Sequence, residues 1–298
     1  MIGTIGVRIE RLNGTVSSMA DDCAAIEEPL EIRIEYGPLQ QRRLKSIAVT
    51  MRTPGRDDEL TAGFLWTEGV IEDPDAVDEV ILRGPSTAGY ETRIAEDNGV
   101  PTVLSDSATT NVVIARLHPD ARVRVSNLER NFYTTSSCGV CGKASLAALR
   151  VVSPPRLFDT FEMRASVLSS LPKRLRDTQP IFAATGGIHG AAIVTQDGEI
   201  QLTREDVGRH NAVDKLIGHA VIGYALPFRD RCLMLSGRAS FELMQKAVMA
   251  GIPFVAAVGA PSSLAITVAQ EFDMTLVGFL RDGRFNVYSG FRRLSITR

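Results

Sequence analysis

Hydrophobic and polar residues alternate along two stretches near the start of the chain. Residues 30–35 read Leu-Glu-Ile-Arg-Ile-Glu, and residues 47–51 read Ile-Ala-Val-Thr-Met. A period of two is typical of strands with one buried face. Residues 57–70 instead place apolar side chains at helical spacing behind two aspartates that can cap a helix. Further strand-like stretches occur at 79–83, 90–95 and 110–124, so this part predicts a small α+β unit.

The pattern changes in the second half of the chain, where strand-like and helix-like stretches take turns. Such an alternation is typical of an α/β layered sheet. We therefore predict two domains, a smaller α+β domain over 1–130, with a disordered amino terminus over about 1–20, and an α/β domain over 131–298. The predicted strands of the second domain are 181–184, 191–195, 231–235, 254–258, 275–280 and 285–288, and its helices are 163–171, 207–222, 241–250 and 262–270.

Composition and charge exclude several classes of protein. The chain has 298 residues, of which 44% are hydrophobic and 23% charged, as in a soluble globular protein. A net charge of −2 gives no basic field that would attract nucleic acid. No apolar run is long enough to cross a bilayer, and no signal peptide is visible. We therefore expect a cytoplasmic protein without nucleic-acid or membrane partners.

The segment Ser-Cys-Gly-Val-Cys-Gly at 137–142 is the strongest chemical signal in the sequence. A cysteine reacts as its thiolate, and a Cys-x-x-Cys spacing with a nearby cation or helix start lowers the pKa of the thiol. Lys143 supplies a cation next to Cys138 and Cys141. A reducing compartment makes a catalytic, redox or metal-binding pair more plausible than a structural disulfide.

Several interpretations of this pair compete. A zinc knuckle needs four ligands, but Cys23 and Cys232 are single and no histidines have paired ligand spacing, so we expect no bound metal. A zinc deaminase would need His-x-Glu and a proline before the first cysteine, and both are missing. A thioredoxin-like dithiol, a persulfide-bearing sulfur-transfer site and a loop without chemistry remain open from these residues alone.

Polar groups also gather in the predicted α/β domain. On a helix, Val207, His210, Asn211 and Asp214 share one face, which we expect to meet a ligand, a partner or a polar network. The turns at 235–240 and 258–263 lie between a strand and a helix, where free N–H groups and the helix dipole favour anions. If both turns share a sheet edge with Gly186, Gly187 and His189, a phosphate-bearing ligand becomes credible, since ligands favour that edge. The first turn carries Ser236, Gly237 and Arg238.

The segment 130–145, which contains the cysteine pair, resembles the central motif of the FdhD family, the formate dehydrogenase accessory sulfurtransferases. The resemblance continues through Met-Arg-Thr-Pro-Gly at 51–55 and Thr-Gly-Gly-Ile-His at 185–189, and through 205–215, 236–240 and 275–284. It covers nearly the whole chain after residue 25. The motifs are long and occur in the family's order.

The resemblance implies a cytidine-deaminase-like layered α/β domain, a homodimer and a function as a sulfur carrier. Members of the family take persulfide sulfur from a cysteine desulfurase and pass it to the bis(molybdopterin guanine dinucleotide) molybdenum cofactor, which formate dehydrogenase then receives. Cys138 aligns with the family's persulfide-carrying cysteine and Cys141 with its partner. A cofactor-contacting stretch of the family aligns with Phe279, Leu280, Arg281, Asp282, Gly283 and Arg284. We add Ser236, Gly237, Arg238 and His210 to this predicted site from their local chemistry.

Two alternatives remain beside a sulfurtransferase that acts through a cysteine persulfide. The first is a chaperone that binds and shields the molybdenum cofactor and uses the cysteines only for docking. The second is a redox dithiol protein, in which Cys138 and Cys141 form a reversible disulfide. Transfer of labelled sulfur distinguishes the carrier from both.

Overall fold

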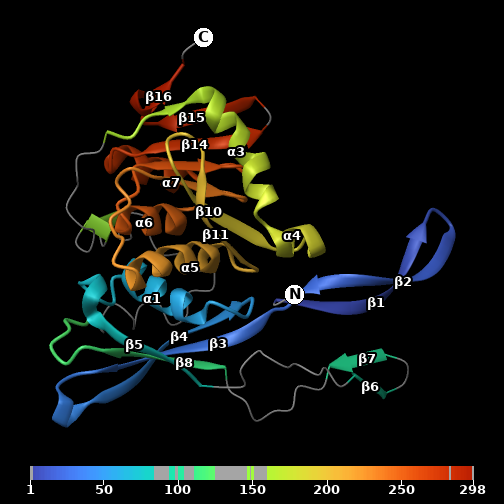
Figure 1. The fold of residues 1–298 in the computed structure, drawn as a ribbon, viewed down its shortest axis with the longest axis horizontal. Coiled ribbons are helices and arrows are strands. Elements are labelled where there is room, and N and C mark those ends of the chain that lie inside the picture. The colour runs from blue at the N-terminus through green and yellow to red at the C-terminus, as the bar shows by residue number, and fades with distance from the viewer. Residues whose placement is uncertain are drawn as a thin grey trace.

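A computed structural model describes most of the chain as two β-sheets with helices between and beside them (Figure 1). The described residues are 3–83, 94–97, 100–103, 111–124, 146–147, 149–150, 160–281 and 283–296. The mixed α/β class predicted from the sequence is confirmed. Its cytidine-deaminase-like layering stays an expectation. None of the described helices is long and apolar enough to cross a membrane.

The smaller sheet has four strands in the order β4-β3-β8-β5, and α1 packs against one of its faces. β3 and β8 are parallel, while the other neighbours are antiparallel. The strands predicted over 30–35, 47–51 and 79–83 and the helix predicted from residue 57 are confirmed here, although the helix ends at Thr67 and the strand expected over 110–124 is shorter. Most of the strand predicted over 90–95 lies outside the described residues. The bounds are β3 (Glu28–Tyr36), β4 (Arg43–Arg52), α1 (Asp57–Thr67), β5 (Val77–Arg83) and β8 (Val112–Leu117), with a separate short pair β6 (Ile94–Asp97) and β7 (Val100–Val103).

The larger sheet has six strands in the order β11-β10-β12-β13-β14-β15. Its centre, β12 to β14, is parallel. β10 and β15 flank this centre and are antiparallel to it, and β11 pairs antiparallel with β10 at the edge. Its elements are α3 (Ala165–Asp177), α4 (Pro180–Thr185), β10 (His189–Val194), β11 (Ile200–Asp206), α5 (Arg209–Ile222), β12 (Cys232–Leu235), α6 (Phe241–Met249), β13 (Phe254–Ala257), α7 (Ser263–Glu271), β14 (Thr275–Arg281) and β15 (Arg284–Ser289), with β9 (Met163–Arg164) and β16 (Leu294–Ser295) paired at one side.

One predicted element of this half is wrong, and another begins two residues later than predicted. Residues 181–184 form α4 and not a strand, because Pro180 starts a helix and Gly186, in the left-handed conformation, ends it. The helix expected from residue 207 begins at Arg209, and the polar residues before it form β11. The sequence Thr-Arg-Glu-Asp at 203–206 alternates too weakly to show a strand, because it pairs at the sheet margin and only Asp206 is fully buried.

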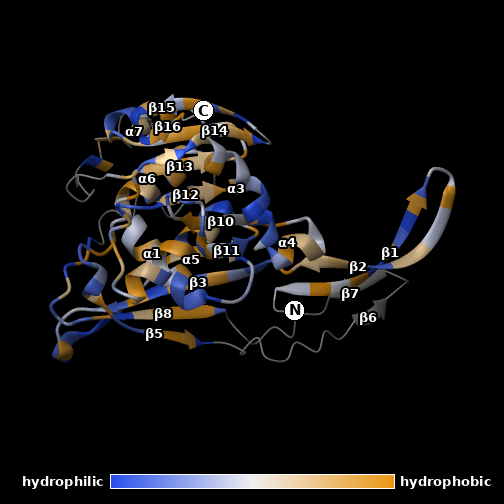
Figure 2. Ribbon diagram, turned by 45° about the horizontal axis from the view of Figure 1, so that its top comes forward, coloured by the Kyte–Doolittle hydropathy of each residue, from blue (hydrophilic) through white to orange (hydrophobic). Residues whose placement is uncertain are grey.

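The amino terminus was expected to be disordered, and this expectation is wrong for the described residues. β1 (Thr4–Asn13) and β2 (Val16–Ala25) form a hairpin that extends away from the rest of the molecule (Figure 1). Most of its side chains are exposed, and polar and apolar colours are mixed along it (Figure 2). Main-chain pairing holds the two strands together, so no hydrophobic pattern shows the hairpin in the sequence.

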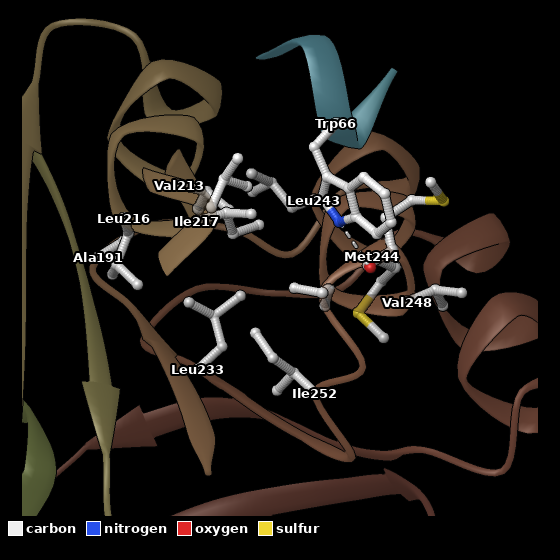
Figure 3. Packing of buried hydrophobic residues seen from close by; sticks show 14 of the residues in the cluster. Trp66, Ala191, Val213, Leu216, Ile217, Leu233, Leu243, Met244, Val248 and Ile252 are labelled. Atoms are coloured by element: carbon white, nitrogen blue, oxygen red, sulfur yellow. Dashed lines mark hydrogen bonds between the residues drawn. The ribbon is translucent and has the colours of Figure 1, made fainter. Parts of the chain in front are cut away.

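One hydrophobic core lies between the two sheets. It joins Leu30 and Ile32 of β3 to Leu216 of α5 and Leu243 of α6. Figure 3 shows this packing, with the indole N–H of Trp66 donating to the carbonyl of Met249 at 2.9 Å. A second cluster covers the other face of the larger sheet beneath α3. The sheets fall on either side of residue 130, but they share a core, so the division into two domains stays a prediction.

The main chains of helices α1 and α5 come into direct contact where the two helices cross. A methyl group built on Gly63 would lie 1.9 Å from the carbonyl oxygen of Asp214, and one built on Gly218 would lie 1.7 Å from that of Glu59. No side chain fits at either position. Two glycines facing each other's helix therefore set the separation of the two sheets.

Candidate functional site

The carboxyl ends of β12, β13 and β14 lie next to one another and continue as a ladder of main-chain hydrogen bonds. Gly259 N–H donates to the carbonyl of Gly237 at 2.9 Å, and Phe279 N–H donates to the carbonyl of Gly259 at 3.0 Å. The two turns that the sequence suggested as anion sites therefore share one sheet edge. The stretch that starts at Phe279 joins them there.

Gly259 lets the first two turns approach closely. A Cβ atom at this position would lie 2.9 Å from both the nitrogen of Arg238 and the carbonyl oxygen of Gly237. Any side chain would push the turns apart. The concave backbone at this edge thus depends on a glycine.

Phe279 has an unusual backbone conformation at this sheet edge. Its φ of 53° lies in the left-handed region, which a bulky residue rarely adopts. The pairing of β14 with β15 slips between Gly278 and Arg281, so Phe279 occupies a β-bulge. Backbone strain of this kind concentrates at ligand sites. The tight turn beyond it presents Arg281 and Arg284 to solvent.

The residues of the predicted cofactor-contacting stretch therefore differ in how deeply their side chains are buried. Phe279 is half-buried, and Arg281, Gly283 and Arg284 are exposed. The side chain of Leu280 is fully buried in the core beneath α3, so it supports the stretch from below and does not face a ligand. Asp282 lies outside the described residues.

His189 brings a second element to the same edge. β10 runs antiparallel to β12, so its first residue lies beside the turn that follows β12. Gly190 N–H donates to Ser236 Oγ at 2.9 Å, and a Cβ atom built on Gly237 would be 3.4 Å from His189 Nδ1. The pair Gly186-Gly187 ends α4 just before His189, which places it near this edge as predicted.

His210 lies in the first turn of α5 and points toward the start of α6. Its Nε2 is 3.4 Å from Ser240 Oγ and 3.9 Å from the carboxylate of Glu242. Burial, followed by the charges of Lys246 and Arg209, lowers the pKa of His210 to about 4. Burial and Arg209 also lower the pKa of His189. His210 is therefore neutral at physiological pH and acts as a hydrogen-bonding group.

The remaining polar residues of the α5 face bind protein groups. Asn211 Nδ2 donates to the carbonyl of Met51 at 2.7 Å and to Asp206 at 3.0 Å. Asp214 is buried, accepts from Thr67 Oγ1 at 2.7 Å and lies 2.9 Å from Lys246 Nζ. Of the three roles expected for this face, these two residues take the polar network. Val207 precedes the helix.

Arg209 is the residue that the sequence reasoning missed. It is the first residue of α5, next to His210, and its Nε atom is buried without a hydrogen-bond partner in the described part of the chain. Its charge lowers the pKa of both His189 and His210, after burial. An arginine in the first turn of a helix opposes the helix dipole, and that conflict was the available signal.

Cys138 and Cys141 lie outside the described residues. Of the two cysteines within them, Cys23 is half-exposed on β2 and Cys232 is buried in β12, where burial raises the pKa of its thiol. Among the described residues no group of three or more His, Cys, Asp or Glu side chains is arranged to hold a metal ion.

The fold and this edge define an α/β protein whose parallel strand ends carry glycine turns and arginines suited to a phosphate-bearing ligand. The model of the FdhD/NarQ family matches residues 25–295. The chain is 48% identical over 286 residues to the sulfur carrier protein FdhD of Streptomyces avermitilis, covering 95% of this chain and 93% of that protein. It is 44% identical over 291 residues to the sulfur carrier protein FdhD of Mycobacterium tuberculosis, covering 97% of each. The chain therefore belongs to the FdhD/NarQ family.

A solved structure has a similar fold. The crystal structure of a putative formate dehydrogenase accessory protein from Desulfotalea psychrophila superposes with a TM-score of 0.69. The match covers 98% of this chain and 99% of that one, at 21% sequence identity. The likeness extends over both sheets.

Proposed function

We propose that this protein carries sulfur as a persulfide on Cys138. It receives the sulfur from a cysteine desulfurase and passes it to the bis(molybdopterin guanine dinucleotide) molybdenum cofactor for formate dehydrogenase. Two likenesses support this proposal, namely relatives that are called sulfur carrier proteins and a similar fold in a formate dehydrogenase accessory protein. A homodimer in the cytoplasm is part of the same proposal.

The observation that carries the acceptor side is the ladder of Gly237, Gly259 and Phe279 at one sheet edge. The acceptor has two guanine nucleotides linked through pyrophosphates, so it needs anion-binding turns and arginines. The edge offers Arg238, Arg281 and Arg284 in exposed positions, and Phe279 is half-exposed beside them. The glycine turns pack so closely that a side chain at Gly259 would push them apart. These residues fit the nucleotide part of the ligand.

The sulfur step follows from thiol chemistry. The thiolate of Cys138 attacks the outer sulfur of the desulfurase persulfide, a new S–S bond forms, and the desulfurase thiolate leaves. Cys138 then carries one extra sulfur, and no net oxidation occurs. Cys141, three residues away, is placed by sequence to stabilise this persulfide or to exchange with it. Cys23, single on β2, and Cys232, buried in β12, lack the neighbouring cysteine that such an exchange uses.

The test is transfer of labelled sulfur. Incubation with a cysteine desulfurase and ³⁵S-cysteine should label the wild-type chain at the peptide containing Cys138, with a mass increase of one sulfur. Cys138→Ala should abolish the label without changing the thermal unfolding temperature. Cys23→Ser is the matched control and should keep full labelling.

The outcome separates the candidate functions. A Cys138→Ala protein that still takes up reducible label and supports formate dehydrogenase would exclude the relay. An unlabelled wild-type chain that nevertheless binds the cofactor would identify a chaperone. A reversible disulfide between Cys138 and Cys141 in the unlabelled protein would instead indicate a redox dithiol.

A further inference from the structure

A pocket of about 410 Å³ opens on the smaller sheet, on the face opposite to the hydrophobic core. Along β3, Ile32 and Ile34 belong to the core, so Arg33 and Glu35, which alternate with them, point to the other face. Ile114 of β8 pairs with Arg33 and lies at the bottom of the pocket, 7% exposed. The core side of this sheet faces α1 and the larger sheet (Figure 1). The pocket therefore lies on a different sheet from the candidate site.

Arginine side chains make up most of the lining of this pocket. Arg33 comes from β3, Arg43 from β4 and Arg83 from β5, and Arg42 directly precedes β4. Glu35 is the one acidic residue among the described residues that line it. Because the chain as a whole has a net charge of −2, this excess of positive charge is local. Like charges that share a pocket repel one another, and a bound anion relieves that repulsion.

Two of the four arginines are held in place by contacts within the protein. Arg42 donates to the carbonyl of Leu117 at 2.7 Å and to that of Glu35 at 2.9 Å. Arg33 forms a two-point pair with Glu31, with distances of 2.9 Å and 2.7 Å. These contacts fix the shape of the pocket before any ligand binds, which reduces the entropy that binding costs.

The other two arginines, Arg43 and Arg83, have no ion pair and no side-chain hydrogen bond with any residue that the structure describes, and both are exposed. Glu35 does not neutralise them, because Arg42 and Arg116 each lie 3.3 Å from one of its carboxylate oxygens. A free guanidinium presents a planar fork of donors that matches a carboxylate. The pocket therefore has two cations available for carboxylates from outside.

An exposed apolar stripe on β4 continues from the pocket. Leu44, Val49 and Met51 are 54%, 67% and 46% exposed, and they pair with Glu35, Glu31 and Pro29 of β3 on the same face. Leu44 also lines the pocket, and β4 is the edge strand of its sheet. A basic pocket with an adjoining apolar stripe fits an extended chain that carries both acidic and apolar side chains. A lone inorganic anion would leave the stripe unused.

We propose that this pocket and the β4 stripe form a docking surface for an acidic, extended segment of a partner protein. Carboxylates of the segment pair with Arg43 and Arg83, and its apolar side chains cover Leu44 and Val49. Nucleic acid fits less well, because no aromatic side chain on which bases could stack is among the described lining residues. Docking here does not depend on the chemistry of Cys138.

The first test is fluorescence anisotropy with the full-length protein and a fluorescein-labelled hexapeptide of alternating glutamate and valine, at pH 7 and low salt. The wild type should bind it, and a peptide with lysine in place of glutamate should not bind. The double variant Arg43→Gln/Arg83→Gln should weaken binding roughly three- to thirtyfold, as for the loss of two exposed ion pairs. Added salt should weaken the wild-type binding, because it screens exposed charges.

The matched control removes two other exposed arginines that have no ion pair among the described residues. These are Arg176 at the end of α3 and Arg229 in the loop before β12. Arg176→Gln/Arg229→Gln makes the same change in net charge and should bind the peptide as the wild type does. Urea unfolding should give the same stability for both double variants and the wild type, because all four side chains are exposed.

Methyl spectra locate the bound peptide. On addition of the glutamate–valine peptide, the methyl signals of Ile114, Leu44 and Val49 should shift. The signals of Ile217 and Ile252, which are buried in the core beside the larger sheet, should stay unchanged. Shifts at Ile217 and Ile252 without shifts at Ile114 would place the peptide elsewhere and overturn the docking surface.

The remaining outcomes also decide the proposal. Equal binding of the peptide to Arg43→Gln/Arg83→Gln and to the wild type would overturn it. So would tighter binding of inorganic phosphate or of a single-stranded oligonucleotide than of the peptide at this surface. A change from dimer to monomer in sedimentation of the double variant would assign the surface to a second copy of the chain. Absence of sulfur labelling at Cys138 with intact peptide binding would refute the proposed function and leave the docking surface standing.

Discussion

Two residues at the strand ends, Gly259 and Phe279, have opposite requirements for their side chains. Gly259 needs the absence of a side chain, whereas Phe279 keeps a large one in a left-handed conformation that favours glycine. Because such a conformation is unfavourable for a bulky residue, the ring itself must matter at this position. The fixed part of the site therefore consists of backbone geometry as much as of charged side chains.

Gly259→Ala tests the closeness of the turns. The added methyl group meets backbone atoms of Gly237 and Arg238 at 2.9 Å, so the turns must separate. We expect a loss of about 1–3 kcal/mol in the free energy of unfolding, measured with urea, together with weaker pyrophosphate binding. Gly187→Ala is the control, since the nearest atom to its added methyl group lies 3.8 Å away. Equal stability of the two variants would contradict this account.

For single residues, the sequence showed which side chains have suitable chemistry, but it did not show how deeply each is buried or which partners it has in the fold. Arg238 was predicted from a strand–turn–helix pattern that is local and therefore visible in the sequence. Arg209 was missed because its significance lies in the burial of Nε and in the absence of a partner among the described residues, both of which depend on the tertiary fold. Leu280 matched the family pattern, yet its side chain faces the core.

Helix α5 shows that the contacts of a whole helix are also not visible in its sequence. Helical spacing correctly put His210, Asn211 and Asp214 on one side, but spacing does not reveal what that side faces. Asn211 donates to the carbonyl of Met51 on β4. Asp214 is bonded by Thr67 of α1 and paired with Lys246 of α6. Only His210, at the helix end, reaches the candidate site.

Asp214 makes the stability of this helix contact dependent on pH. Burial raises its pKa to about 6, although Lys246 and Thr67 act in the opposite direction and Glu68 adds to the rise. A carboxyl group whose pKa is higher in the folded than in the unfolded state stabilises most at low pH, and that contribution is lost as pH rises through 6. Asp214→Asn removes the titration.

The measurement is urea unfolding of both proteins at pH 4.5 and pH 7.5. The free energy of unfolding of the wild type, minus that of Asp214→Asn, should be larger at pH 4.5 than at pH 7.5. A difference that is the same at both values, or that grows with pH, would show that Asp214 is ionised throughout.

For the molecule as a whole, the alternation of strands and helices predicted the elements of the larger sheet well, because its buried strands and amphipathic helices carry strong patterns. Strand order and the sharing of one core between the sheets depend on long-range contacts and were not visible. The hairpin of β1 and β2 was missed for the opposite reason, since it has almost no buried face.

The hairpin of β1 and β2 allows a prediction about the stability of the whole molecule. Its outer half contributes no residue to either core cluster. Replacing residues 9–20 by a two-residue Asn-Gly turn should therefore change the free energy of unfolding by no more than about 0.5 kcal/mol, as for other surface changes. Calorimetric unfolding measures this. A drop in melting temperature of several degrees would show that the hairpin supports the body.

The crossing of α1 and α5 has a consequence for building hybrids with relatives. Because Gly63 and Gly218 each fit against the carbonyl of the opposite helix, the amino-terminal sheet and the larger sheet are matched at one joint. A chimera joined near residue 130 would combine an α1 and an α5 of different origin, and any residue other than glycine at either position would not fit against the opposite helix. A chimera with a relative should therefore take both α1 and α5 from the same protein.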